Sequence, residues 1–199
     1  MRTAWACLCL VMVLFPALAR GEDPATLIQS ATEFLNQGKY SKAIEDLQWA
    51  LREIRLLQTV ELKKFLPQSV SGYTAEEVDA DAAAAAMFNI NLVEAERKFQ
   101  ASSGDEYVDL KITSGDIGGA GLGAMMKMSQ MFGEQQGELV RVKGRKCTLE
   151  WDADNSSGKL TCVLDNDIQV TVEVSNGQKA TPAKFMELVN LDGLEKATL

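Results

Sequence analysis

Histidine is absent from the 199 residues of the sequence. Its absence excludes Ser-His-Asp and Cys-His catalysis, metal sites with imidazole ligands, and proton transfer by a histidine side chain. Carboxylates and lysines are the acid–base groups that remain, so an enzyme with this sequence would have to work with those.

Basic clusters and long apolar runs are also lacking. The chain has 20 Lys and Arg residues against 28 Asp and Glu residues, which gives a net charge of −8. An acidic chain without a basic cluster argues against binding to nucleic acid or to an anionic lipid surface. After residue 19, no stretch is apolar enough to span a bilayer.

The first 19 residues have the pattern of a secretory signal peptide. A basic start at Met1–Arg2 precedes an apolar run from Ala4 to Phe15, and Ala17-Leu18-Ala19 supplies the small residues at a cleavage site. The apolar part is short for a membrane span, so an uncleaved anchor is the weaker alternative. We expect export to the periplasm or beyond, with a mature chain that begins near Arg20 and has no membrane anchor.

Cysteine is scarce, and only Cys147 and Cys162 lie beyond the predicted leader. In an oxidising compartment, a disulfide between them is the default. If they face each other in a hairpin, the turn is centred between Asp154 and Asn155, within the turn-like run DADNSSG. The chain has no Cys-x-x-Cys motif, so we predict a structural bridge across two strands rather than a redox site.

Residues 20–66 have the periodicity of a helical hairpin, with a break at Asn36-Gln37-Gly38. The run NQGKYSKAIEDLQWAL resembles the core of a tetratricopeptide repeat. The resemblance covers one unit, whereas such arrays need about three, so it implies a helical pair that packs on something else. The residues expected on the inner sides of the two helices are Leu27, Ile28, Ala31, Phe34, Leu35, Ala43, Ile44, Leu47, Ala50, Leu51, Ile54 and Leu57–Leu62.

The run KKFLPQSVSGYTAEE marks the boundary to an α+β domain at residues 67–199. Leu66-Pro67 followed by Gly72-Tyr73 resembles the "LP…GW" start of this domain in a group of uncharacterised exported bacterial proteins, with Tyr73 in place of the tryptophan. The resemblance implies a helical pair in front of an α+β domain and no activity. Thr74 is predicted to cap a short alanine-rich helix, with a strand that starts within the alanines as the alternative.

Beyond residue 89 the pattern alternates between apolar and polar residues. About six strands are expected in LVEAERKFQA, EYVDLKIT, ELVRVKG, RKCTLEW, KLTCVLD and DIQVTVEVS, most of them joined by short turns. A final helix is expected in TPAKFMELV, beginning at a Thr-Pro cap. The predicted fold class is therefore α+β, with helices on one face of a mostly antiparallel sheet.

The segment from Ser114 to Gly133 has five glycines followed by four methionines. A dinucleotide site would need a parallel β-α-β unit, which the antiparallel pattern disfavours. The methionines could ligate Cu(I), but apolar neighbours favour a role in core packing. We expect a flexible loop that enters a buried helix.

No motif in the sequence indicates a substrate. The sequence therefore favours a non-enzymatic exported protein that contacts another protein or a small apolar ligand. Trp49, Arg52 and Arg55 are the candidate partner-binding residues, although Trp49 could instead pack between the two domains. The alternative is an enzyme that uses carboxylates with Lys143 or Lys146 in a cleft under the Gly115–Gly123 loop. We expect no cofactor and no metal site, and neighbouring acidic residues are interpreted as solvated faces.

Overall fold

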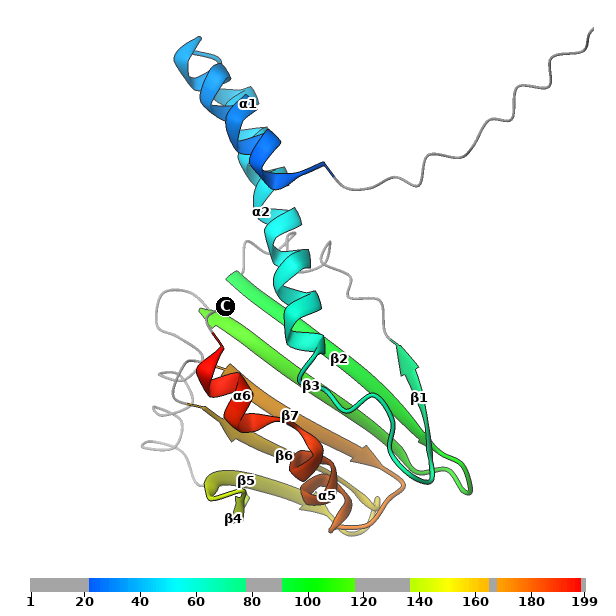
Figure 1. Ribbon diagram of the computed structural model, residues 1–199. Coiled ribbons are helices and arrows are strands. Elements are labelled where there is room, and N and C mark those ends of the chain that lie inside the picture. Colours follow the sequence, from blue (N-terminus) through cyan, green and yellow to red (C-terminus); the bar gives the residue numbers. More distant parts are fainter. Residues whose placement is uncertain (1–21, 78–90, 117–136, 165–167, 198–199) are drawn as a thin grey trace, which may run out of the picture.

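The structure is a computed structural model that describes residues 22–77, 91–116, 137–164 and 168–197. The predicted leader, residues 78–90 and most of the glycine–methionine segment lie outside the described residues. Helices and strands are separated along the chain: a helical pair, seven strands, and two short helices (Figure 1). Their bounds are α1 Pro24–Asn36, α2 Tyr40–Lys63, β1 Tyr73–Glu77, β2 Asn91–Ala101, β3 Tyr107–Asp116, β4 Glu138–Val142, β5 Arg145–Asp152, β6 Ser157–Val163, β7 Ile168–Ser175, α5 Thr181–Leu188 and α6 Leu191–Lys196.

The strands form one sheet in the order β1-β2-β3-β7-β6-β5-β4, and every neighbouring pair is antiparallel. This confirms the α+β class and the antiparallel sheet, but the sheet has seven strands in the described residues rather than about six. Alternation along the strands gives the sheet one apolar face, which the end of α2 and the helices α5 and α6 cover (Figure 1). The strand residues buried on this face include Val93, Ala95, Phe99, Val108, Leu110, Ile112, Leu149, Leu160, Val170, Val172 and Val174.

The additional strand is β1, where the sequence pattern predicted the start of a helix. That prediction was wrong at Thr74, which lies in β1 opposite Gln100 of β2. The backbone of β1 pairs with the free edge of β2, and the Tyr73 ring packs edge-on against Phe185, with ring centroids 4.9 Å apart. Pairing with an available sheet edge therefore outweighs a local preference for a capped helix.

Helices α1 and α2 form an antiparallel hairpin that projects from the sheet, here called the arm (Figure 1). Small residues allow close approach where the helices pack, since Ala31, Ala43 and Ala50 are buried together with Leu27. Gly38 joins the helices with φ of +71°, a left-handed conformation that favours glycine. The predicted helical pair is thus present, and its second helix continues to the sheet.

The residues of the "LP…GW"-like motif join the arm to the sheet. Leu66 is buried in the core, and the Pro67 carbonyl accepts a hydrogen bond of 2.9 Å from the Arg97 side chain. Gly72 adopts φ of +85°, and its carbonyl accepts from the backbone of Ser102. These contacts give the motif a structural role at the junction.

The final helix predicted in TPAKFMELV is present as α5, which packs on β6 and β7, but its cap differs from the predicted one. Ala180 is the N-cap residue, whereas the Thr181 hydroxyl donates a hydrogen bond of 2.6 Å to Glu106. The same carboxylate accepts from the Tyr73 hydroxyl at 2.8 Å. Glu106 therefore links the start of α5 to β1.

Candidate functional site

The predicted disulfide lies in the hairpin of β5 and β6. Cys147 is directly opposite Cys162, their Cα atoms are 4.4 Å apart, and the sulfur atoms are at bonding distance. The register also places Trp151 opposite Gly158. Both cysteines are buried in the core, so the bridge joins the two strands inside the protein.

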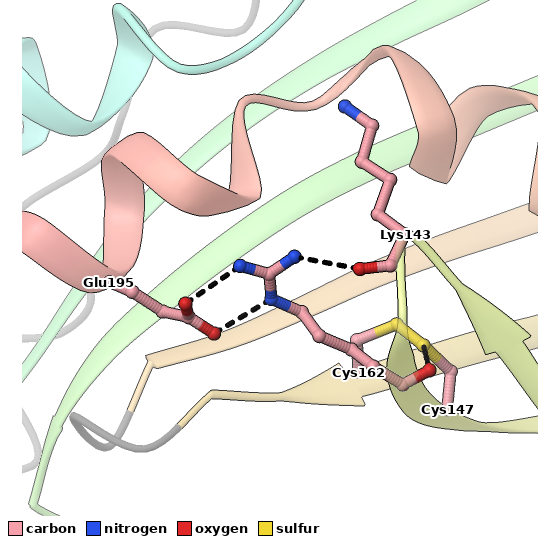
Figure 2. The surroundings of a disulfide bond; sticks show 5 residues. Lys143, Cys147, Cys162 and Glu195 are labelled. Atoms are coloured by element: carbon pink, nitrogen blue, oxygen red, sulfur yellow. Dashed lines mark hydrogen bonds and ion pairs between the residues drawn. A yellow bond between two sulfur atoms is a disulfide. The ribbon is translucent and has the colours of Figure 1, made fainter.

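Arg145, two residues before Cys147, connects α6 to the turn between β4 and β5 through hydrogen bonds to Glu195 and Lys143. Figure 2 shows Glu195 and Lys143 in the surroundings of the bridge. The Arg145 Nε donates to Glu195 at 2.7 Å, and its Nη2 donates to Glu195 at 2.7 Å and to Asp192 at 2.6 Å. Its Nη1 donates to the Lys143 carbonyl at 3.2 Å. The hydrogen bonds from Arg145 lower the pKa values of the Glu195 and Asp192 carboxyls. This cluster is satisfied internally and serves as a tertiary clamp.

The structure separates the two lysines proposed for an enzymatic cleft. Lys143 lies in the β4–β5 turn with φ of 47°, and its Nζ donates to the Val189 carbonyl at 2.8 Å. Lys146 is exposed and lies opposite Arg141 of β4. Of the Gly115–Gly123 loop, only Gly115 and Asp116 belong to the described residues, where they end β3.

The opposite face of the sheet, which α2, α5 and α6 do not contact, brings together two carboxyl groups that the sequence analysis did not connect. Glu96 of β2 lies opposite Lys111, and Asp109 of β3 lies opposite Lys98. The two acids are therefore diagonal neighbours on one face, and their carboxyls share a hydrogen bond. Lys98 Nζ is 3.2 Å from the Glu96 carboxylate, whose side chain is 16% exposed.

Glu96 and Asp109 share one proton, and the pKa values of their two carboxyls differ. Burial raises the pKa of Asp109 to about 7, and the hydrogen bond and negative charge of Glu96 act in the same direction. The pKa of Glu96 is lowered, because the hydrogen bond from Asp109 and the contact with Lys98 outweigh its burial. The pair can hold a proton near neutral pH.

A different surface is formed by apolar side chains on the arm. Of the large hydrophobic residues that are exposed in the described part of the chain, all except Leu139 and Leu188 belong to α1 or α2. The expectation that apolar residues of the two helices lie on their inner sides was wrong for several positions. Each helix contacts the other along a single row of residues, so the neighbouring apolar rows stay exposed. The exposed residues of the arm are Ile28, Leu35, Tyr40, Ile44, Leu47, Trp49, Leu51, Leu57 and Val60.

Six of these residues form what we call the apolar stripe. Successive residues of a helix are rotated by about 100°, which aligns residues three, four or seven apart. This rotation places one exposed apolar row of α1 and one of α2 on the same side of the hairpin, next to the row through which the two helices contact each other. The stripe consists of Ile28, Leu35, Tyr40, Ile44, Leu47 and Leu51, each between 44% and 64% exposed.

The predicted partner-binding residues lie elsewhere around α2. Trp49 is 46% exposed, and the Arg52 guanidinium carbon is 5.1 Å from the centre of its ring. Arg55 is rotated by about 120° from Trp49 and borders the apolar stripe instead. Trp49 lines a groove of about 360 Å³ with Glu22, Leu27, Glu45, Asp46 and Glu53, so its surroundings are acidic. The three residues therefore do not form a single patch.

Comparison of the chain with protein-family models, curated proteins and solved structures found no match. The resemblances to a tetratricopeptide repeat and to exported bacterial proteins therefore stay predictions. Within the described residues, no helix is long and apolar enough to cross a membrane, and no group of three His, Cys, Asp or Glu residues is arranged around a metal position.

Proposed function

We propose that the protein is a non-enzymatic binding protein of the cell envelope that docks on another protein through the apolar stripe of its arm. The observation that carries this proposal is the placement of six large, half-exposed side chains along one side of a two-helix arm. Water-exposed apolar surface of this extent on an ordered helix is typical of a protein-binding site.

The construction of the rest of the chain supports this role. The arm continues into the core through Leu62 and Leu66, which are 0% and 3% exposed, so the stripe is held in a fixed position relative to the sheet. The Cys147–Cys162 bridge and the Arg145 clamp stabilise the base from which the arm projects. A disulfide and a leader-like N-terminus both fit an exported protein.

Site-specific photocrosslinking in the cell tests the proposal. A photoreactive phenylalanine analogue in place of Ile44 or Leu51 is expected to give the same adduct, because both positions lie on the stripe. The analogue at Val60, which is exposed on α2 but off the stripe, is the matched control and should give none. Adducts at Trp49 alone would move the docking surface to the acidic groove, and their absence at every arm position would contradict the proposal.

The second candidate, an enzyme based on carboxylates, has one observation in its favour. Asp109 is a carboxyl with a pKa of about 7 beside Glu96, and groups with such values are suited to general acid–base catalysis. This candidate predicts hydrolysis of an ester, glycoside or phosphate substrate with a pH profile that inflects near 7. The Asp109→Asn variant should lose that activity, and equal rates for both proteins would refute this candidate.

A further inference from the structure

We infer that the stripe docks on the same stripe of a second copy of this chain, so that two arms form a four-helix bundle. This inference rests on the proposed docking function and names its partner. The arguments come from the spacing of the stripe, the distribution of charge around it, and its area.

The spacing along α2 is that of a helix that packs lengthwise against another helix. Tyr40, Ile44, Leu47, Leu51 and Ile54 follow one another at intervals of four, three, four and three residues. This is the a/d repeat that places side chains along one seam of a coiled coil or helical bundle. The line that contacts α1, with Ala43 and Ala50, lies beside this seam, so α2 presents one seam to α1 and leaves the other exposed.

The charge around the seam suits an identical partner. The protein carries a net charge of −8, so two copies repel each other over most of their surface. The polar residues that border the stripe are Thr32, Gln48, Arg55 and Gln58, none of them acidic. Glu45, Asp46 and Glu53 instead line the groove at Trp49, on the opposite side of α2. Two stripes can therefore meet without bringing carboxylates face to face. A partner of different sequence would find few charged groups at the stripe with which to form specific ion pairs.

The area of the stripe matches a reversible dimer. A fully exposed Leu or Ile side chain presents on the order of 100 Å² of apolar surface, so six half-exposed side chains present roughly 300 Å². A standard interface buries about 800 Å² per partner, and a little over half of that area is apolar. The stripe supplies about two-thirds of this apolar area, and we expect a dissociation constant on the order of 10 µM. In such a dimer, the helical pair of one copy would bury its apolar stripe against the helical pair of the other, as neighbouring units do in a repeat array.

Sedimentation velocity of the purified protein between roughly 1 and 200 µM, a range chosen around the expected constant, tests the inference. The wild type should pass from monomer to dimer. Leu47→Glu combined with Leu51→Glu should weaken association at least 100-fold, because four carboxylates would be brought together at an apolar seam. Leu57→Glu combined with Val60→Glu is the matched control: it adds the same charge to equally exposed positions of α2 off the stripe, and its dissociation constant should stay within threefold of the wild type.

A charge-swap mixture keeps the test decisive if the double variant is poorly folded. Leu47 is the middle residue of the seam, so it meets Leu47 of the other copy whether the arms pair in parallel or antiparallel. Leu47→Glu and Leu47→Lys should each be monomeric alone and should form a dimer when mixed. Thermal unfolding of each variant checks that the fold is retained.

The outcomes separate this inference from the function on which it rests. A wild type that is monomeric throughout, or a dimer that the stripe variants do not weaken, overturns the pairing of two arms. If such a monomer still gives crosslinks to a different protein at Ile44 and Leu51, the docking function stands and only the identity of the partner is wrong. A monomer without crosslinks contradicts both.

Discussion

Asp109 shows how the position of a residue in the sheet changes its chemistry. An aspartate in an unfolded chain has a pKa of about 3.9. In β3 the pKa is raised to about 7 by burial and by Glu96, with Lys111 and Lys98 opposing the shift. The folded state therefore holds a proton that the unfolded state has lost between these pH values. The contribution of Asp109 therefore lowers the free energy of unfolding as the pH rises from about 4 to about 7.

Replacing the Asp109 carboxyl by an amide should remove this fall in stability at high pH. Asn at position 109 can still donate a hydrogen bond to Glu96 but cannot ionise, so Asp109→Asn should be more stable than the wild type at pH 8. We expect a gain of about 1 kcal/mol, below the full linkage value because water screens this partly exposed site. The gain should shrink as the pH falls from 8 to 5 and disappear only at about pH 4, where Asp109 is protonated in the unfolded chain as well.

Urea unfolding of the two proteins between pH 5 and 8 provides the measurement. Asp154→Asn is the control, since Asp154 is an exposed carboxylate in the β5–β6 turn, away from Glu96. Glu96, with its lowered pKa, contributes stability above its unfolded pKa that is lost on acidification, and this contribution should be largely common to the wild type and the control. A difference between Asp109→Asn and the wild type that does not change with pH would contradict the assignment of the proton.

The β5–β6 hairpin is an element whose register follows from local sequence. The turn run fixes which residues face each other, and the cysteines are 15 residues apart at facing positions. Inside the hairpin, Gly158 lies under the Trp151 ring, and a side chain at Gly158 would collide with it. The bridge therefore reinforces a pairing that the turn and this close contact already favour.

Removal of the bridge should destabilise the protein without changing its fold. Cys147→Ala with Cys162→Ala avoids burying new polar groups, and the loss expected for a loop of about 15 residues is roughly 3 kcal/mol, or less if the hairpin persists in the unfolded chain. Urea unfolding should give this difference, and reduction of the wild type should reproduce it. Two freely alkylated thiols in the native exported protein would show that the bridge does not form.

For the molecule as a whole, the arm extends from one side of the sheet and is anchored at a single end (Figure 1). Leu62, Leu66 and Val70 fix that end in the core, whereas α1 contacts mainly α2. The exposed stripe is thus carried away from the sheet, where a second arm can reach it. This arrangement makes the stripe accessible and fits the proposed binding function.

Export of the whole chain is the remaining prediction. Expressed in a bacterium with its first 19 residues intact, the protein should be recovered from the periplasm with an N-terminus near Arg20, because the basic start, apolar run and Ala17-Leu18-Ala19 are those of a cleaved leader. N-terminal sequencing of the fractionated protein gives the result. A full-length species that stays in the cytoplasm would refute the prediction, and replacement of Ala19 by a large residue should prevent cleavage.

Several contacts that matter here could not be predicted from the sequence. Glu96 and Asp109 belong to strands whose alternation was recognised, but their diagonal contact depends on the register of β2 against β3 and on burial that no local pattern encodes. Arg97 occupies a position of β2 where the alternation places apolar residues. Its side chain is buried there and donates a hydrogen bond to the Pro67 carbonyl. A basic residue in phase with Ala95 and Phe99 was the only signal of this contact.

The sequence by itself determined the helical pair, the alternation of β2 to β7 and the facing cysteines, because periodicity and tight turns depend on residues close together in the chain. Only the tertiary structure decided that Thr74 pairs as an edge strand and that Ile44, Leu47 and Leu51 stay exposed. Both outcomes depend on which neighbours a segment meets. An apolar line on a helix looks the same in sequence whether it faces a core, a partner or water, and three-dimensional packing makes the distinction.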